Sequence, residues 1–237
     1  MTFCLGMKLE EGLVAIADTR VVSGTEVIRA RKISVYQKDQ SAMFVMTSGL
    51  RSVRDKSITY FEDHIATMEE PFDRLFKAVN AFADQLRRVS NEDRQALFSS
   101  GLSFDMYALI GGQMSRDKEP MLYLVYPQGN WVEVGAGTPY QIIGSTAYGK
   151  PVLDRTLKYT DKMAFALKVG CLAFDSTRIS AADVDFPLDV VLYKRNEFKL
   201  AEHRYEKNEL AELSNWWANR LRQSVNEVPA GAIDKLF

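Results

Sequence analysis

The sequence predicts an α+β fold in which two antiparallel sheets stack face to face between two layers of helices, a four-layer αββα sandwich. Two observations predict it: strand patterns occur in runs, and pairs of helix patterns separate these runs. The chain has 237 residues, of which 46% are hydrophobic, so it can bury a large core. We find no linker, low-complexity tract or internal repeat, and therefore expect residues 1–237 to form a single domain.

Four strand patterns open the chain. From Phe3 to Leu9 every second residue is a large apolar one, and these alternate with a cysteine, a glycine and a lysine, which is the period of a strand packed on one face. Three further strands are expected at residues 12–17, 32–36 and 42–47.

Two helices are expected next, at residues 50–68 and 72–91, because apolar residues recur on one face in each. Pro71 marks the break between them. The polar segment 91–102 is predicted to be a loop or a frayed helix end.

The second half of the chain repeats this order of elements. Strands are predicted at residues 104–111, 121–126, 131–134 and 140–144, with a hairpin turn at 127–130. Helices at 149–157 and 161–177, strands at 188–194 and 198–205, and a helix at 209–222 complete the pattern. The tail, residues 224–237, is expected either to extend from the body and contact a neighbour or to be disordered.

Composition excludes several classes of function. A net charge of -1 with both signs mixed along the chain disfavours nucleic acid as a partner. The sequence contains neither a secretion leader nor a membrane-spanning run, so we expect a cytoplasmic protein. Cys4 and Cys171 lack metal-ligand spacing, and His64 and His203 offer little for a histidine-based triad. With no phosphate-binding glycine loop either, no metal and no cofactor are expected.

The start of the chain contains a possible nucleophile. Initiator methionine is normally removed when a small residue follows, and Thr2 would then carry both a hydroxyl and a free α-amino group. A threonine hydroxyl needs a base, and an α-amine with a pKa of about 8 can act as one. Asp18 ends the second strand, Lys32 opens the third, and Gly49 follows the fourth.

These residues resemble a known family. Thr2, Asp18, Lys32 and the turn at residues 48–55 are similar to the threonine, aspartate, lysine and glycine of proteasome β-subunits and the bacterial peptidase HslV. The opening Met-Thr-Phe-Cys-Leu-Gly and the later Phe-Asp-Ser-Thr at 174–177 resemble the bacterial proteasome-related Anbu group. The resemblance covers nearly the whole chain and implies the N-terminal-nucleophile (Ntn) hydrolase fold.

The resemblance also implies roles for individual residues. Asp18 would position Lys32, whose ammonium would favour the deprotonated forms of the Thr2 hydroxyl and amine. The Gly49 N–H would point at the oxyanion of an acyl intermediate. Each residue also has an ordinary structural interpretation: Thr2 as a polar strand start, Asp18 as a turn former, Lys32 as a solvated strand start and Gly49 as a helix-start glycine.

Three further site residues rest on the resemblance alone. Ser145 corresponds to the serine of the proteasome Gly-Ser-Gly turn, and Asp175 to an aspartate near the nucleophile. The chain departs from the family here, because Arg178 and Ile179 replace the serine and glycine that follow that aspartate. Arg51 occupies a position that lines the substrate pocket in proteasome subunits, where it would pair with an acidic substrate residue; alternatively, it points to solvent.

Two functions remain open at this stage. The first is a threonine hydrolase that cleaves peptide or other amide bonds through an acyl-enzyme on Thr2. The second is a non-catalytic assembly or scaffold protein of the proteasome type. In either case the resemblance implies a large homo-oligomer, an open ring or a helix, with Trp216 and Trp217 as candidate contacts. The sequence identifies no ATPase partner.

Overall fold

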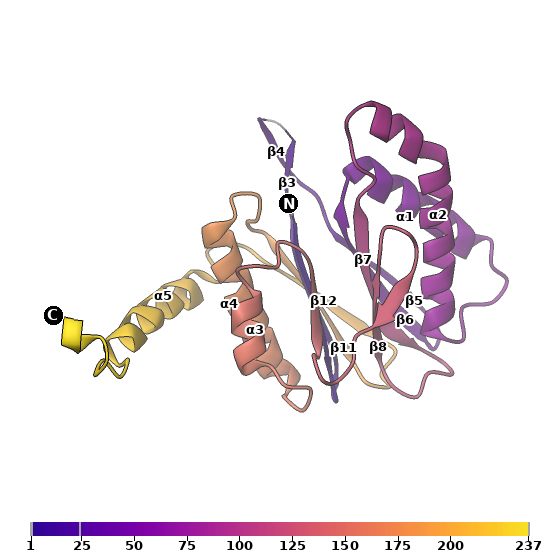
Figure 1. Cartoon of the computed structure of the whole chain (residues 1–237). Helices are drawn as coiled ribbons and strands as arrows, with labels where there is room; N and C mark the ends of the chain where they lie inside the picture. The colour runs from indigo at the N-terminus through magenta and orange to yellow at the C-terminus, as the bar shows by residue number, and fades with distance from the viewer. Residues whose placement is uncertain (1, 24, 237) are drawn as a thin grey trace.

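The chain folds into two stacked antiparallel sheets with helices on both outer faces, as the computed structural model in Figure 1 shows. The structure describes residues 2–23 and 25–236; Met1, whose removal the sequence predicts, and Phe237, part of the predicted contact tail, lie outside them. The predicted αββα fold is therefore confirmed.

The first sheet has five strands in the order β10-β1-β2-β11-β12, all antiparallel to their neighbours. Its strands are β1 (Phe3–Leu9), β2 (Gly12–Asp18), β10 (Tyr140–Gly144), β11 (Leu188–Lys194) and β12 (Leu200–Tyr205). The strand that follows Thr2 thus lies inside the sheet, paired on both sides.

The second sheet also has five antiparallel strands, in the order β5-β6-β7-β8-β9. Its strands are β5 (Ile33–Lys38), β6 (Ser41–Gly49), β7 (Met106–Met114), β8 (Met121–Val125) and β9 (Trp131–Glu133).

A two-stranded hairpin connects the two sheets and was not predicted. It consists of β3 (Arg20–Ser23) and β4 (Glu26–Arg29), and it projects from the top of the molecule in Figure 1. All four residues of β4 are exposed, so this hairpin has no core-facing pattern that periodicity could detect.

Residues that alternate along each strand divide the core into layers. On β1, Leu5 belongs to the cluster that faces the helices of the first sheet, whereas Cys4 belongs to the cluster between the sheets. On β6, Val45 faces the helices of the second sheet and Phe44 faces inward. Because successive side chains of a strand point to opposite faces, each strand contributes to two cores.

The helices cover the sheets in pairs, as predicted. Helices α1 (Arg51–Ala66) and α2 (Leu75–Ser99) pack on the second sheet, and α3 (Lys150–Thr156) and α4 (Met163–Ser180) pack on the first. No described helix combines the length and apolar character that crossing a bilayer requires.

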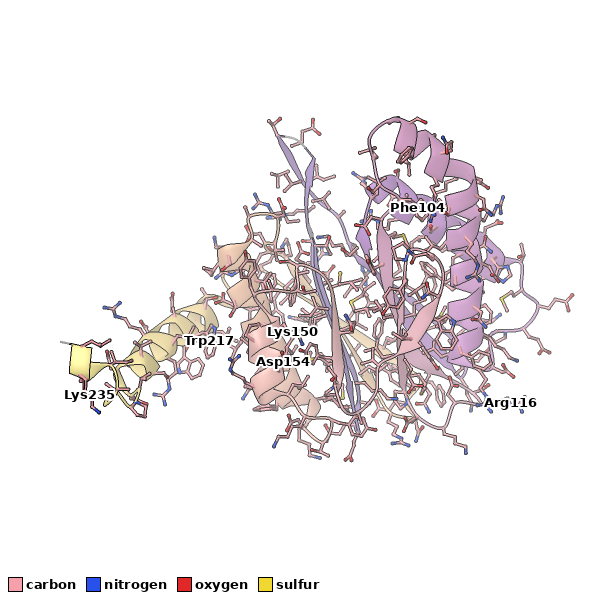
Figure 2. All side chains as sticks on the ribbon, viewed as in Figure 1. Phe104, Arg116, Lys150, Asp154, Trp217 and Lys235 are labelled. Carbon is pink, nitrogen blue, oxygen red and sulfur yellow. The ribbon has the colours of Figure 1, made fainter. Side chains whose placement is uncertain are left out.

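Segment 91–102, which was predicted to be a loop or a frayed helix end, is instead regular helix as far as Ser99. The helix continues to Ser99 with its polar residues paired across to α1. Lys56 Nζ lies 2.7 Å from Glu92 Oε2 and 2.8 Å from Asp93 Oδ1. At the end of the helix, the Arg94 guanidinium lies over the ring of Phe104, which is labelled in Figure 2. These contacts between elements are not visible in a local pattern.

Helix α5 (Ala211–Asn226) points away from the body and has no buried residue. It is longer than the predicted 209–222, so the start of the predicted tail at residue 224 belongs to this helix. A short 3-10 helix (Asp234–Leu236) follows at the far end. Helix α5 is attached to α4 in part by a hydrogen bond of 3.2 Å from Trp217 Nε1 to Ser176 Oγ, and Figure 2 labels Trp217 at that junction.

Candidate active site

Hydrogen bonds hold the backbone at the head of β1 on both sides. The Thr2 carbonyl accepts a hydrogen bond of 2.6 Å from the backbone N–H of Ser145. The next N–H, that of Phe3, donates to Asp18 Oδ1 at 2.8 Å. Thr2 itself is 9% exposed. The sheet therefore fixes the backbone around Thr2 while part of the residue stays accessible.

The close approach of residue 144 to Thr2 requires a glycine. Gly144 has φ +91°, and a Cβ placed on it would lie 1.9 Å from the Thr2 carbonyl oxygen. Only glycine has no Cβ to clash there and adopts this backbone conformation readily. Gly144 and Ser145 together form the turn beside Thr2, and the contact of Ser145 with Thr2 is made by its backbone N–H.

Asp18 and Lys32 form a buried ion pair beneath this strand end. Lys32 Nζ lies 2.7 Å from Asp18 Oδ1, with side chains 2% and 0% exposed. The same Nζ donates to the Arg20 carbonyl at 2.7 Å, and the other Asp18 oxygen accepts the Arg20 N–H at 3.1 Å. Burial raises the pKa of Asp18, and the Lys32 ammonium and the Phe3 N–H oppose part of that rise.

Gly49 ends β6 two residues before α1 begins. Its φ is +132°, and a Cβ there would lie 2.0 Å from the Asp105 carbonyl oxygen. The adjacent N–H of Leu50 donates to that oxygen at 2.8 Å. The strand can turn sharply into the helix here because Gly49 has no side chain.

A cleft of 690 Å³ brings four of the predicted residues together: Thr2, Lys32, Gly49 and Arg51 all line it. Asp18 lies behind the cleft as the partner of Lys32. Sequence spacing places these residues on four separate elements, and the two stacked sheets bring them to one place.

Asp175 lies in a different network. Its Oδ1 accepts hydrogen bonds from Arg178 Nε at 2.9 Å and from Ser214 Oγ of α5 at 2.5 Å. Arg178, which stands where the family has a serine, thus pairs with Asp175, while Ile179 is exposed. The interactions described for Asp175 link α4 to α5 rather than to Thr2.

Sequence reasoning missed two arginines that also line the cleft, Arg20 and Arg54. Both could have been found from their spacing. Arg20 follows Asp18 by two residues, and Arg54 lies one helical turn after Arg51.

The two cysteines and the possible metal ligands add no chemistry to the site. Cys4 and Cys171 are buried free thiols, and burial raises the pKa of both, that of Cys171 to about 12. Among the described residues, no group of three His, Cys, Asp or Glu side chains could hold a metal ion.

Two stacked antiparallel sheets between helix layers, with a threonine at the head of a central strand, define an N-terminal-nucleophile hydrolase fold of the proteasome type. The chain belongs to the proteasome subunit family: the family model described as "Proteasome subunit" matches residues 2–179.

Solved structures of Anbu proteins are similar to nearly the whole chain. The Gly-1 mutant of Anbu from Hyphomicrobium sp. strain MC1 is 28% identical with a TM-score of 0.88, covering 96% of this chain and 99% of that one. Anbu, the ancestral β-subunit, from Yersinia bercovieri is 26% identical with a TM-score of 0.87, covering 96% and 98%.

A third structure, the helical assembly of the Anbu complex from Pseudomonas aeruginosa, is 25% identical with a TM-score of 0.89, covering 96% of this chain and 97% of that one. No curated protein sequence matches the chain.

Proposed function

We propose that the chain, once Met1 is removed, is a threonine peptidase that cleaves peptide bonds through an acyl-enzyme on Thr2. One observation carries the proposal: Thr2, Lys32 and Gly49 line the same cleft, and Lys32 is held there by the buried Asp18. A buried ion pair has a large desolvation cost, so its position beside an accessible threonine favours a catalytic use.

The first step requires a free amine. While Met1 is attached, the nitrogen of Thr2 is a planar amide without a basic lone pair. After its removal, the amine accepts the hydroxyl proton, directly or through one water, as the threonine oxygen attacks the substrate carbonyl carbon. The Lys32 ammonium favours the negative charge that develops on that oxygen.

The carbonyl oxygen then becomes an oxyanion, and the Gly49 N–H is our candidate for its donor. When the intermediate collapses, the C–N bond breaks and the leaving amine takes the proton that the α-amine held. The ester on Thr2 is hydrolysed by water, which gives its proton to the α-amine in turn. We assign supporting roles to two further residues. The Ser145 N–H holds the Thr2 carbonyl, and the Asp175 carboxylate orients the Thr2 amine.

The alternative, a non-catalytic assembly protein, is favoured by the partners of Asp175. In a catalytic subunit we expect this carboxylate to orient the Thr2 amine, but here Arg178 and Ser214 bind its Oδ1. In the catalytic alternative, Oδ2 of Asp175 orients the amine once Met1 is removed.

The test is the reaction of Thr2 with an electrophile. The N-terminal peptide of the purified chain is measured by mass spectrometry to determine whether Met1 is removed, and the processed protein is then treated with a peptide vinyl sulfone. The Thr2 oxygen adds to the vinyl carbon β to the sulfone, and its proton ends on the carbon next to the sulfone, so the mass rises by that of the whole probe. We expect labelling on Thr2 and peptide cleavage by the wild type, partial activity in Thr2→Ser and none in Thr2→Ala. Equal cleavage by Thr2→Ala would exclude the threonine mechanism.

We also propose that the chain assembles with copies of itself. The similar Pseudomonas aeruginosa protein forms a helical assembly. In this chain α5 projects from the body and exposes Trp216, Leu221 and Val225, and the segment after it exposes Val228 and Ile233. A second copy that covered these side chains would remove apolar surface from water.

A further inference from the structure

Basic side chains dominate the walls of the cleft. Among the described residues that line it, four are cationic and one is anionic: Arg20, Lys32, Arg51 and Arg54 against Asp105. The carboxylates that pair with the three arginines, Asp55 and Asp185, do not line the cleft. The arginines therefore stand between the cleft and their carboxylate partners.

Arg54 is the better placed of the two arginines on α1. Its side chain is 16% exposed, compared with 56% for Arg51. Its Nε and Nη2 donate to Asp55 Oδ1 at 2.8 and 2.6 Å, which fixes the guanidinium. A guanidinium has five N–H donors, so donors remain for a second carboxylate.

The charge of Arg54 also acts at the head of β1. Burial raises the pKa of the Cys4 thiol, and the cations that oppose this rise are Lys32 and Arg54. Because Arg54 and Thr2 line the same cleft, a substrate residue bound there can contact both. Arg51 is not among the charges that act on this thiol.

Arg20 provides a further cation among the residues that line the cleft. Its carbonyl accepts the Lys32 ammonium, and its Nη1 lies 3.2 Å from Asp185. Its Nε is buried and has no hydrogen-bond partner among the described residues. The cost of a buried unpaired donor is offset when a bound acceptor reaches it.

We propose that this site, if it has the function proposed above, selects peptides with an acidic residue immediately before the cleaved bond, and that Arg54 binds that carboxylate. Charge-assisted hydrogen bonds from a fixed guanidinium are strong and directional, and binding of glutamate in place of glutamine adds charge attraction to an otherwise matched shape. Arg20 adds to the positive field, and Arg51, at the exposed mouth, contributes less.

The experiment uses two peptide vinyl sulfones that differ in one residue, a glutamate or a glutamine next to the reactive group. The rate of Thr2 labelling by each probe is measured on the processed, assembled protein at low and high salt. We expect the glutamate probe to label at least about 10-fold faster at low salt, with a smaller ratio at high salt because ions screen the attraction.

Variants assign the preference to a residue. Arg54→Gln should bring the ratio of the two rates close to one, Arg54→Glu should favour the glutamine probe, and Arg54→Lys should keep part of the ratio. Arg116→Gln is the matched control, since Arg116 is an exposed arginine paired with Asp73 at the other end of the molecule in Figure 2. The circular dichroism of each variant verifies its fold.

The outcomes separate the two proposals. Equal rates for both probes on the wild type, or a ratio that Arg54→Gln leaves unchanged, would overturn the acidic preference while the threonine mechanism stands. Labelling by neither probe would overturn the threonine mechanism and the acidic preference with it.

Discussion

Lys32 is held at the cleft by one buried carboxylate and one backbone carbonyl, those of Asp18 and Arg20. The carboxylate also accepts two backbone N–H groups, from Phe3 and Arg20. A single side chain thus connects the lysine to the strand that carries Thr2. Substitutions of Lys32 alone, and of Lys32 together with Asp18, can therefore separate the effect on stability from the effect on activity.

Replacing Lys32 by methionine should affect both properties. Activity should fall by about 10³-fold in kcat/KM, or about 4 kcal/mol in the barrier, because the cation that favours negative charge on the threonine oxygen is lost. Stability should fall by about 3–5 kcal/mol, because Asp18 becomes an unpaired buried carboxylate. Steady-state kinetics and urea unfolding measure the two effects.

The double variant Lys32→Met with Asp18→Asn is the control. It removes the unpaired charge, so most of the stability should return while the activity stays low. Wild-type turnover by Lys32→Met would contradict the role of this lysine.

Gly49→Ala tests whether the turn before α1 depends on glycine. The added Cβ would meet the Asp105 carbonyl at 2.0 Å in a backbone conformation that alanine rarely adopts, so the free energy of unfolding should fall by about 1–3 kcal/mol. Gly135→Ala, where a Cβ meets nothing within 4 Å, should be close to neutral. Equal thermal unfolding of the two variants would contradict this account.

At the scale of elements, charged groups of α1 pair with the C-terminal half of α2. Glu92 accepts hydrogen bonds from Lys56, Tyr60 and Arg88, and those from Lys56 and Tyr60 lower its pKa to about 2. The start of the segment predicted to be a loop or a frayed helix end is thus held against α1 by complementary groups.

Glu92→Gln should reduce stability in a pH-dependent way. The pKa of Glu92 is below its ordinary value of 4.5, so its contribution is present above pH 4.5 and is lost as the pH falls toward about 2. The urea midpoint of the variant should be slightly below that of wild type at pH 7, and the difference should shrink on acidification. The effect is small because the pair is partly solvated.

The exposed Glu69, replaced by glutamine, is the matched control and should show no such pH dependence. A constant difference between Glu92→Gln and wild type from pH 7 to pH 3 would contradict the assignment.

At the scale of the whole molecule, α5 is a helix that a monomer leaves with no buried residue. Light scattering at micromolar concentration should give a mass many times that of the 26.8 kDa chain. Trp216→Glu should lower this mass, because it places a charge where an apolar contact is expected. Phe98→Glu changes a still more exposed apolar residue on α2 and should have less effect. A monomeric wild type would contradict the assembly proposal.

The sequence by itself determined the sandwich and identified four of the residues that line the cleft. Alternation along β1 and apolar runs in β2 and β6 identify strands because burial imposes a period on residues that are neighbours in the chain. The resemblance to proteasome subunits selected Thr2, Lys32 and Gly49, and these three residues do line one cleft.

Only the tertiary structure decided the features that depend on partners distant in sequence. The β3–β4 hairpin and the end of α2 are stabilised by pairing between segments rather than by a local apolar face. The partners of Asp175 come from Arg178 and from α5, and the inward position of Arg54 compared with Arg51 depends on how α1 packs. Local pattern records which residues are buried, whereas the direction and partner of a charged side chain are set by the elements packed around it.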